Sequence, residues 1–194
     1  MPNYPARGDI ASAKALLDSA GIKPDANGVR IRAILDLIPY GEDWRRAGEY
    51  LKQVLGDIGI KLELRYEDVP TWLKRIYHNY DFVMNVNYFY QLPDPVLGVH
   101  RHYGTDQIRK GTHFVNSSRY SNSELDELLA SGATEANAQK RTQIYKKIQE
   151  ILARDMPVVN LFELQFLTVY NTKLKGAYNS ALGAYASFSE AYLD

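Results

Sequence analysis

The stretch Asp81-Phe-Val-Met-Asn-Val-Asn-Tyr-Phe-Tyr-Gln-Leu-Pro-Asp-Pro95 is the segment around which the predicted fold is arranged. Its apolar residues predict a strand buried on both faces, as in a parallel sheet flanked by helices. These residues are Phe82, Val83, Met84 and Val86. Asn85 and Asn87 are expected on one face, because side chains alternate along a strand.

Aromatic and polar residues follow this predicted strand. Ligands of open α/β sheets bind beyond the carboxyl ends of the strands, where Tyr88, Phe89, Tyr90 and Gln91 fall. We call these four residues the aromatic lip and interpret them as part of a binding site rather than a catalytic centre. The alternative is a core strand whose asparagines are satisfied internally and whose aromatic end is packed.

Periodic segments before the lip complete an alternating order of strands and helices. Alternating or mostly apolar residues predict strands over 29–38 and 60–66, and helical spacing predicts helices over 42–58 and 70–77. Short connections in this order favour right-handed crossovers between parallel strands. We therefore predict a three-layer α/β fold with a mostly parallel central sheet flanked by helices. A helix capped by Asp9 and ended by Gly21 precedes it.

The second half of the chain predicts two further helices and two strands. A capping box at Ser121 begins one helix, which Gly132 would end. Thr134 would cap the longest helix, which Pro157 stops. Strands are expected over 158–164 and 166–170, while 96–115 predicts one helical turn and a polar loop. Beyond Gly176 little periodicity is left.

Composition excludes several classes of function. The chain has 23 basic and 23 acidic residues and no basic run with interleaved aromatics, so nucleic acid is a poor partner. No stretch approaches the roughly 20 apolar residues of a membrane span, and Met1 to Gly8 has no apolar signal core. The absence of cysteine excludes disulfides and thiolate metal sites. Fifteen tyrosines favour an adaptable binding surface.

A search for catalytic or metal-binding patterns finds none of the familiar phosphate-binding, dinucleotide, nucleophile or zinc motifs. His100 and His102 would share a face if extended, but Asp106 and His113 lie at no recognisable ligand spacing from them. No metal and no cofactor is therefore predicted. Asp94, Asp106 and Glu163 are the carboxylates considered for acid–base work, and nothing brings two of them together. A hydrolase using Asp94 and a histidine ranks below a binding protein.

Five segments match, in the same order, motifs of one protein family. They are Ile10 to Gly21, Gln53 to Glu63, Leu92 to Pro95, Asn116 to Leu129, and Arg141 to Leu161. On these residues the chain resembles the C-terminal lobe of the family 5 extracellular solute-binding proteins. That family serves ATP-driven importers of peptides, nickel complexes and related solutes. The likeness extends from about Asp9 to Gly176.

The resemblance implies a periplasmic-binding-protein-like lobe that forms one wall of a ligand cleft. It implies a missing N-terminal lobe, a membrane permease as partner, and a periplasmic or extracellular location for the full-length protein. Residues 1–175 would form the lobe, and 176–194 a tail that returns to the other lobe. A signal sequence and that lobe are expected in whole members of the family, so this chain is expected to be one domain of a longer protein.

One position departs from the family pattern. In peptide-binding members an aspartate just before the "yPDP" motif pairs with the amino group of the peptide. Here Gln91 stands at that position, or Tyr90 if the strand is shifted by one residue. Neither supplies a negative charge, and a buried cation without a counter-charge is costly. We therefore expect either a peptide-like solute or, more in keeping with this change, a neutral polar or sugar-containing one.

The predicted function is ligand capture without a reaction. The candidate ligand-binding residues combine the lip with residues from neighbouring segments. They are Trp72, Asn87, Tyr88, Phe89, Tyr90, Gln91, Asn116 and Arg119. Trp72 and Trp44 are also typical of helix packing. The alternative function is a solute-sensing domain of a cytoplasmic regulatory protein with the same fold.

Overall fold

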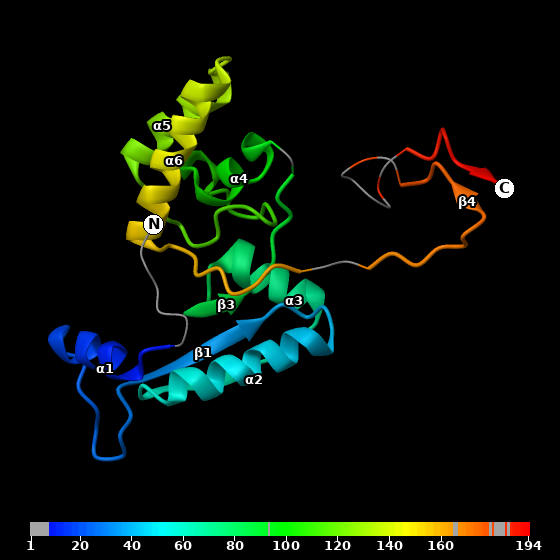
Figure 1. Ribbon diagram of the computed structural model, residues 1–194. Coiled ribbons are helices and arrows are strands. Elements are labelled where there is room, and N and C mark those ends of the chain that lie inside the picture. Colours follow the sequence, from blue (N-terminus) through cyan, green and yellow to red (C-terminus); the bar gives the residue numbers. More distant parts are fainter. Residues whose placement is uncertain (1–7, 93, 165–166, 179, 181–184, 186) are drawn as a thin grey trace. The chain divides into compact units, whose positions relative to one another are not determined.

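The computed structural model describes residues 8–92, 94–164, 167–178, 180, 185 and 187–194 (Figure 1). The chain divides into two compact units, Met1–Pro157 and Val158–Asp194. The first unit therefore ends before the lobe boundary predicted at residue 175, and that boundary stays a prediction.

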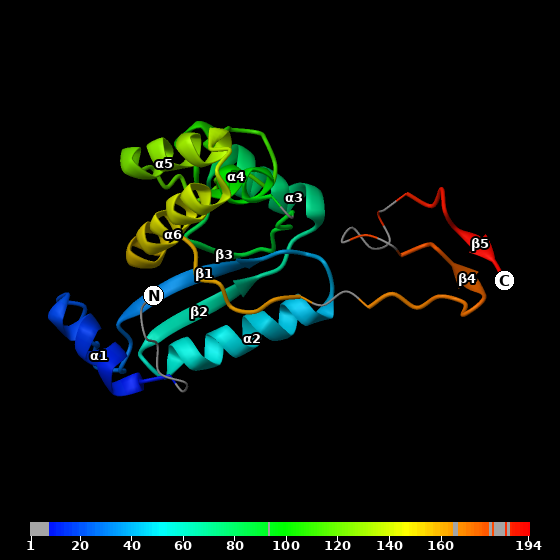
Figure 2. The ribbon, with the colours of Figure 1, turned by 45° about the horizontal axis from the view of Figure 1, so that its top comes forward.

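A parallel three-stranded sheet forms the centre of the first unit. Strand β1 (Ile31–Leu37) lies between β2 (Ile60–Arg65) and β3 (Met84–Val86), and both neighbours run parallel to it. Helix α2 (Glu42–Gly56) links β1 to β2 and packs along both strands (Figure 2). The prediction of a mixed α/β fold with a parallel sheet flanked by helices is confirmed.

Strand β3 is shorter and more exposed than the sequence predicts. It has three residues and, among the described strands, pairs only with β1. Its side chains are therefore less enclosed than those of a central strand, and Val83, just before it, is 71% exposed. The expectation that Val83 is buried is wrong. Pro93, within the opening stretch, lies outside the described residues.

The link from β2 to β3 is helical. Asp68 caps α3 (Val69–Leu73) by accepting a hydrogen bond from the Thr71 amide at 2.8 Å. A π-helical turn, η1 (Lys74–Asn79), continues it. One hydrophobic core joins this link to the sheet and α2. Its buried members are Leu35, Leu37, Ile38, Trp44, Leu62, Trp72, Ile76, Tyr77, Val86 and Val115.

The N-terminal helix α1 (Ile10–Ser19) begins and ends as predicted. Asp9 Oδ1 accepts a hydrogen bond from the Ser12 amide at 2.9 Å, and Gly21 has a φ of 77° beyond its end. None of its residues is buried.

Three short helical elements replace the single turn predicted after the lip. They are η2 (Pro95–Leu97), α4 (Val99–Tyr103) and η3 (Thr105–Gln107). Two longer helices, α5 (Ser123–Thr134) and α6 (Ala138–Asp155), pack against each other to form a second core (Figure 1).

The caps of these two helices differ from the prediction. Asn122 caps α5 and Asn137 caps α6, so neither Ser121 nor Thr134 is an N-cap. Asparagine is as good an N-cap as serine and better than threonine. Asn122 takes the position next to Ser121, whereas Thr134 is the last residue of α5 and Asn137, three residues later, begins α6. Gly132 does not end α5. It lies inside the helix, facing α6. A Cβ at this position would approach the Tyr145 ring to 3.1 Å, so the glycine allows α6 to pack closely.

Among the described residues of the second unit, β4 (Leu174–Lys175) pairs antiparallel with β5 (Tyr192–Leu193). The predicted strands are not seen: 158–164 and 167–170 are not strands, and 165–166 lie outside the described residues. A strand needs a paired neighbouring strand, and among the described residues no strand pairing includes these segments; apolar side chains such as Val169 are exposed. Within the described residues, no helix has the length and apolarity needed to cross a membrane.

Candidate functional site

The aromatic lip lies just beyond the carboxyl end of β3, as predicted. The Tyr88 ring stacks on Trp44 with the centroids 5.6 Å apart and the planes at 29°. Two further tyrosines meet it edge-on, Tyr40 at 5.9 Å and Tyr90 at 6.4 Å. Because Trp44 belongs to α2 and is buried, this stack connects the lip to the core.

The lip borders a hollow of about 180 Å³. Its lining consists of Tyr88, Phe89, Tyr90, Arg101 and Phe114. Three predicted site residues thus lie together around one space. The lining joins flat aromatic surfaces to a single guanidinium, and none of the five residues is acidic.

Arg101 was missed by the sequence reasoning. It belongs to α4, and its Nε is buried without a hydrogen-bond partner among the described residues. Buried donors are normally satisfied, so an unsatisfied guanidinium nitrogen beside a hollow favours a ligand with an acceptor oxygen. Arg101 stands between His100 and His102, and this stretch was considered only as a possible metal site formed by the two imidazoles.

Gln91 lies against α4 rather than reaching freely from the lip. Its Nε2 is 3.1 Å from Nδ1 of His102, and a Cβ on Gly98 would come within 2.0 Å of its Oε1. Burial lowers the pKa of His102 to about 4, so the imidazole is neutral near pH 7 and can accept at Nδ1. His102 therefore holds the Gln91 carboxamide while Phe89 packs on the imidazole at 3.7 Å.

Asn87 connects the lip to the core residue Tyr77 through hydrogen bonds. Its Nδ2 donates to the Tyr77 hydroxyl at 2.7 Å, and its Oδ1 accepts from the Tyr88 amide at 2.8 Å. Burial raises the pKa of Tyr77 to about 12, which keeps the phenol protonated. The Asn87 side-chain amide is thus hydrogen-bonded within the protein. This agrees, for Asn87, with the alternative in which the asparagines are satisfied internally.

The other three predicted residues do not line the hollow. Trp72 is in the core, 1% exposed, and meets Tyr77 edge-on at 5.9 Å. Asn116 is buried and donates to the carbonyl oxygens of Gly104 and Tyr120 at 3.0 and 2.8 Å. The exposed Arg119 stacks on the Tyr80 ring at 5.3 Å.

Helix geometry separates the two histidines of α4. His100 and His102 were expected to share a face if extended, but residues two apart in a helix point in different directions. His100 Nε2 is 3.2 Å from the Tyr145 hydroxyl, whereas His102 meets Gln91. The expected shared face is therefore absent.

A charged network braces the carboxyl edge of the sheet near the lip. Asp36 of β1 is fully buried, and its two oxygens accept from Arg65 Nε and Nη2 at 2.6 and 2.9 Å. Arg75 lies 3.8 Å from the same carboxylate and pairs with both Glu67 and Asp81. In the sheet, Asp36 is the direct neighbour of Asn85 in β3, so the network holds the strand that carries the lip.

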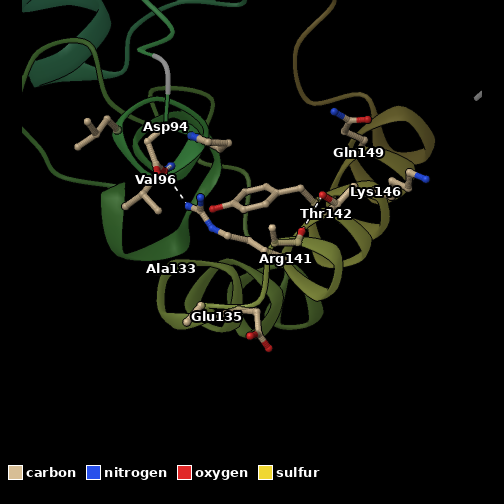
Figure 3. A pocket seen from close by; sticks show the side chains of 13 residues that line it. Asp94, Val96, Ala133, Glu135, Arg141, Thr142, Lys146 and Gln149 are labelled. Carbon is tan, nitrogen blue, oxygen red and sulfur yellow. Dashed lines mark hydrogen bonds and ion pairs between the residues drawn. The ribbon is translucent and has the colours of Figure 1, made fainter.

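A larger hollow of about 960 Å³ lies elsewhere, between η2 and helices α5 and α6 (Figure 3). Arg141 crosses it to pair with Asp94 at 2.8 Å. The guanidinium holds the pKa of Asp94 below its usual range, so this carboxyl stays ionised and is a poor acid catalyst. The hollow is open and contains none of the lip residues, so we place the candidate site at the smaller, aromatic space.

Comparison with known proteins identifies the family. The model of the bacterial extracellular solute-binding proteins, family 5, middle region, matches residues 1–110. The peptide transport periplasmic protein SapA of Haemophilus influenzae is 24% identical over 151 residues, covering 76% of this chain and 26% of SapA. This chain thus spans about a quarter to a third of the curated relatives it matches.

Solved structures agree with this result. AppA of Clostridium difficile has a TM-score of 0.76 at 26% identity, over 96% of this chain and 37% of AppA. A periplasmic oligopeptide-binding protein of Thermotoga maritima, with bound mannohexaose, has a TM-score of 0.69 at 24% identity, over 80% of this chain and 31% of that one.

The chain belongs to the family 5 bacterial extracellular solute-binding proteins. The resemblance seen in the sequence motifs is therefore confirmed. The family consists of binding proteins rather than enzymes, which also agrees with the prediction.

Proposed function

We propose that this chain is the C-terminal lobe of an importer's solute-binding protein and forms one wall of its ligand cleft. A second, N-terminal lobe would close over the lip, and a membrane permease would receive the solute. The relatives' much greater length supports a second lobe. The family's extracellular character supports a periplasmic or extracellular location.

The hollow beneath the aromatic lip is the observation that carries this proposal. Aromatic faces with one guanidinium suit a polar solute that offers flat surfaces and acceptor oxygens, such as a saccharide or a peptide backbone. No lining residue is acidic, and the nearby Gln91 carboxamide is neutral, so a free amine would have no counter-charge there. The ligand is therefore recognised through oxygens and flat faces, not through an amino group.

The bound saccharide of the Thermotoga maritima protein is consistent with this class of ligand, because it was captured by a protein of the same fold. The peptide transport function of SapA supports peptides equally. Both classes carry carbonyl or hydroxyl oxygens for Arg101. One lobe alone would bind weakly, since half of the contacts and the exclusion of water would be missing.

Tryptophan emission provides a direct test. Trp44 stacks on Tyr88, so a solute entering the hollow should change its fluorescence, whereas Trp72 is enclosed in the core. The product of the complete reading frame would be titrated with oligosaccharides and with N-acetylated peptides. We expect Tyr90→Ala to weaken the binding of the active ligand by about five- to tenfold, as for loss of about 1 kcal/mol of aromatic contact.

The matched control is Tyr50→Ala, which removes another exposed tyrosine, 64% exposed against 43% for Tyr90, from α2. It should leave the affinity unchanged. Equal effects of the two substitutions would show that the lip does not bind the solute. The complete reading frame also separates the alternatives: a signal peptide supports import, and a DNA-binding helix-turn-helix supports the regulatory function.

A further inference from the structure

Two exposed imidazoles from distant parts of the chain face each other beside the lip. His78 lies near the end of η1, and His113 belongs to the loop that contains Phe114. Their Nε2 atoms are 3.4 Å apart, and the ring centroids are 5.5 Å apart. The imidazoles therefore meet through their nitrogens rather than stacking face to face.

The separation of the two nitrogens suits a shared metal ion. Hydrogen bonds from N–H donors usually span about 2.7–3.2 Å, so 3.4 Å is long for one. Zinc–imidazole bonds of about 2.0–2.1 Å in a tetrahedral arrangement place two ligand nitrogens about 3.3–3.4 Å apart. The two Nε2 atoms thus already stand at the edge length of such a tetrahedron.

The backbone holds this geometry in place. The Gly111 amide donates to the Tyr77 carbonyl oxygen at 2.8 Å, which ties the residue before His78 to a residue two positions before His113. Gly111 has a φ of 86°, and a Cβ there would come within 3.3 Å of the His78 ring. The His113 ring also rests against Tyr77, with the centroids 5.7 Å apart. A pair so constrained loses little freedom when it binds an ion.

We propose that His78 and His113 form a two-imidazole site for a divalent transition-metal ion of the zinc class. Among the described residues, no group of three or more histidine, cysteine or carboxylate side chains could hold a metal, so this site supplies two ligands. Because both side chains are exposed, water or a second molecule completes the coordination. The bound ion would cross-link η1 to the 111–120 loop.

This site does not overlap the hollow, but it adjoins the residues that support the lip. Tyr77 contacts His113 on one side and accepts the hydrogen bond of Asn87 on the other. Phe114, which follows His113, lines the hollow. Metal binding would therefore stiffen the support of the lip without occupying the hollow.

Calorimetric titration of the chain with Zn²⁺ tests the proposal. The wild type should bind one ion, and His78→Gln and His113→Gln should each raise the Kd at least tenfold. The control His100→Gln also removes one imidazole, but one that meets Tyr145, and it should retain the wild-type Kd. Mg²⁺ should produce no binding heat, because it prefers oxygen ligands.

Two further results keep the test decisive. Melting curves without metal should be unchanged for both pair variants, because the two side chains are exposed, and Zn²⁺ should raise the Tm of the wild type alone among these three proteins. A Kd within threefold of the wild type in either pair variant would overturn the proposal. So would an equal loss of affinity in His100→Gln, or the absence of Zn²⁺ binding by the wild type.

Discussion

Replacing Asp36 by asparagine removes one charge from the network that braces the lip-bearing strand. The Asp36 carboxylate is fully buried and accepts two hydrogen bonds from Arg65, with Arg75 nearby at 3.8 Å. Asparagine has nearly the same shape but keeps only one acceptor oxygen and no charge. Two guanidinium groups would then share a buried edge without their common counter-charge.

The expected loss of stability follows from the burial of the partners. Removing one member of a buried ion pair costs about 3–5 kcal/mol. The Arg65 and Arg75 side chains are 26% and 22% exposed, so water partly compensates their charges. We therefore expect Asp36→Asn to lower the free energy of unfolding by about 2–3 kcal/mol, which corresponds to a fall in Tm of about 4–12 °C for a chain of this size.

Urea denaturation followed by circular dichroism would measure this change. The matched control is Asp106→Asn, since Asp106 pairs with Arg109 at 3.6 Å but both side chains are more than half exposed. Exposed pairs contribute about 0–1 kcal/mol, so the control should change little. If Asp36→Asn and Asp106→Asn lowered stability equally, the network would not have the bracing role assigned to it.

Three further predictions concern packing and pH. Gly48→Ala should lower the free energy of unfolding by about 1–3 kcal/mol, because a Cβ would lie 2.4 Å from a Leu37 methyl carbon; an equally stable variant would contradict this. Burial lowers the pKa of His102 from 6.5 to about 4, so its contribution to stability is full above pH 6.5 and is lost as the pH falls toward 4. Urea titrations at several pH values should show a shallower acid slope for His102→Gln, and an unchanged slope would refute the assignment. Gly98→Ala should displace Gln91 and weaken solute binding, measured by tryptophan emission, whereas wild-type affinity would show that the Gln91 position is unimportant.

Local patterns predicted the first half of the fold well. Helix α1, strands β1 and β2, and helix α2 all lie where their periodicity and caps indicate, because each signal is contained within the element itself. The exposure of Val83 could not be predicted this way. It depends on which strand stands at the edge of the sheet, and apolar residues of edge and central strands look alike.

The strands expected in 158–170 show a second limit of sequence reasoning. Their apolar residues have the composition of strands, but a strand forms only where a neighbour supplies hydrogen bonds. The described parts of this segment form no strand, and Leu167 is 91% exposed. The composition therefore indicated that these residues could form a strand beside a suitable neighbouring strand, but they do not form one in the described parts of this chain.

The sequence predicted only part of the lining of the hollow. Tyr88, Phe89 and Tyr90 are consecutive after a strand, so their place at the sheet edge follows from topology alone. Arg101 joins them only because α4 lies beside the lip, where His102 meets Gln91. The His78–His113 pair is formed by segments far apart in the sequence, joined in part by the Gly111–Tyr77 backbone hydrogen bond, and no spacing rule indicates such a pair.

The central claim is that the lip recognises its solute without a free amine. The most direct measurement compares, by calorimetry on the full-length protein, one peptide with a free amino terminus and the same peptide acetylated. For the wild type we predict equal affinities within about threefold, and for Gln91→Asp a preference of at least tenfold for the free amine. Tighter binding of the free amine by the wild type, by tenfold or more, would contradict the account.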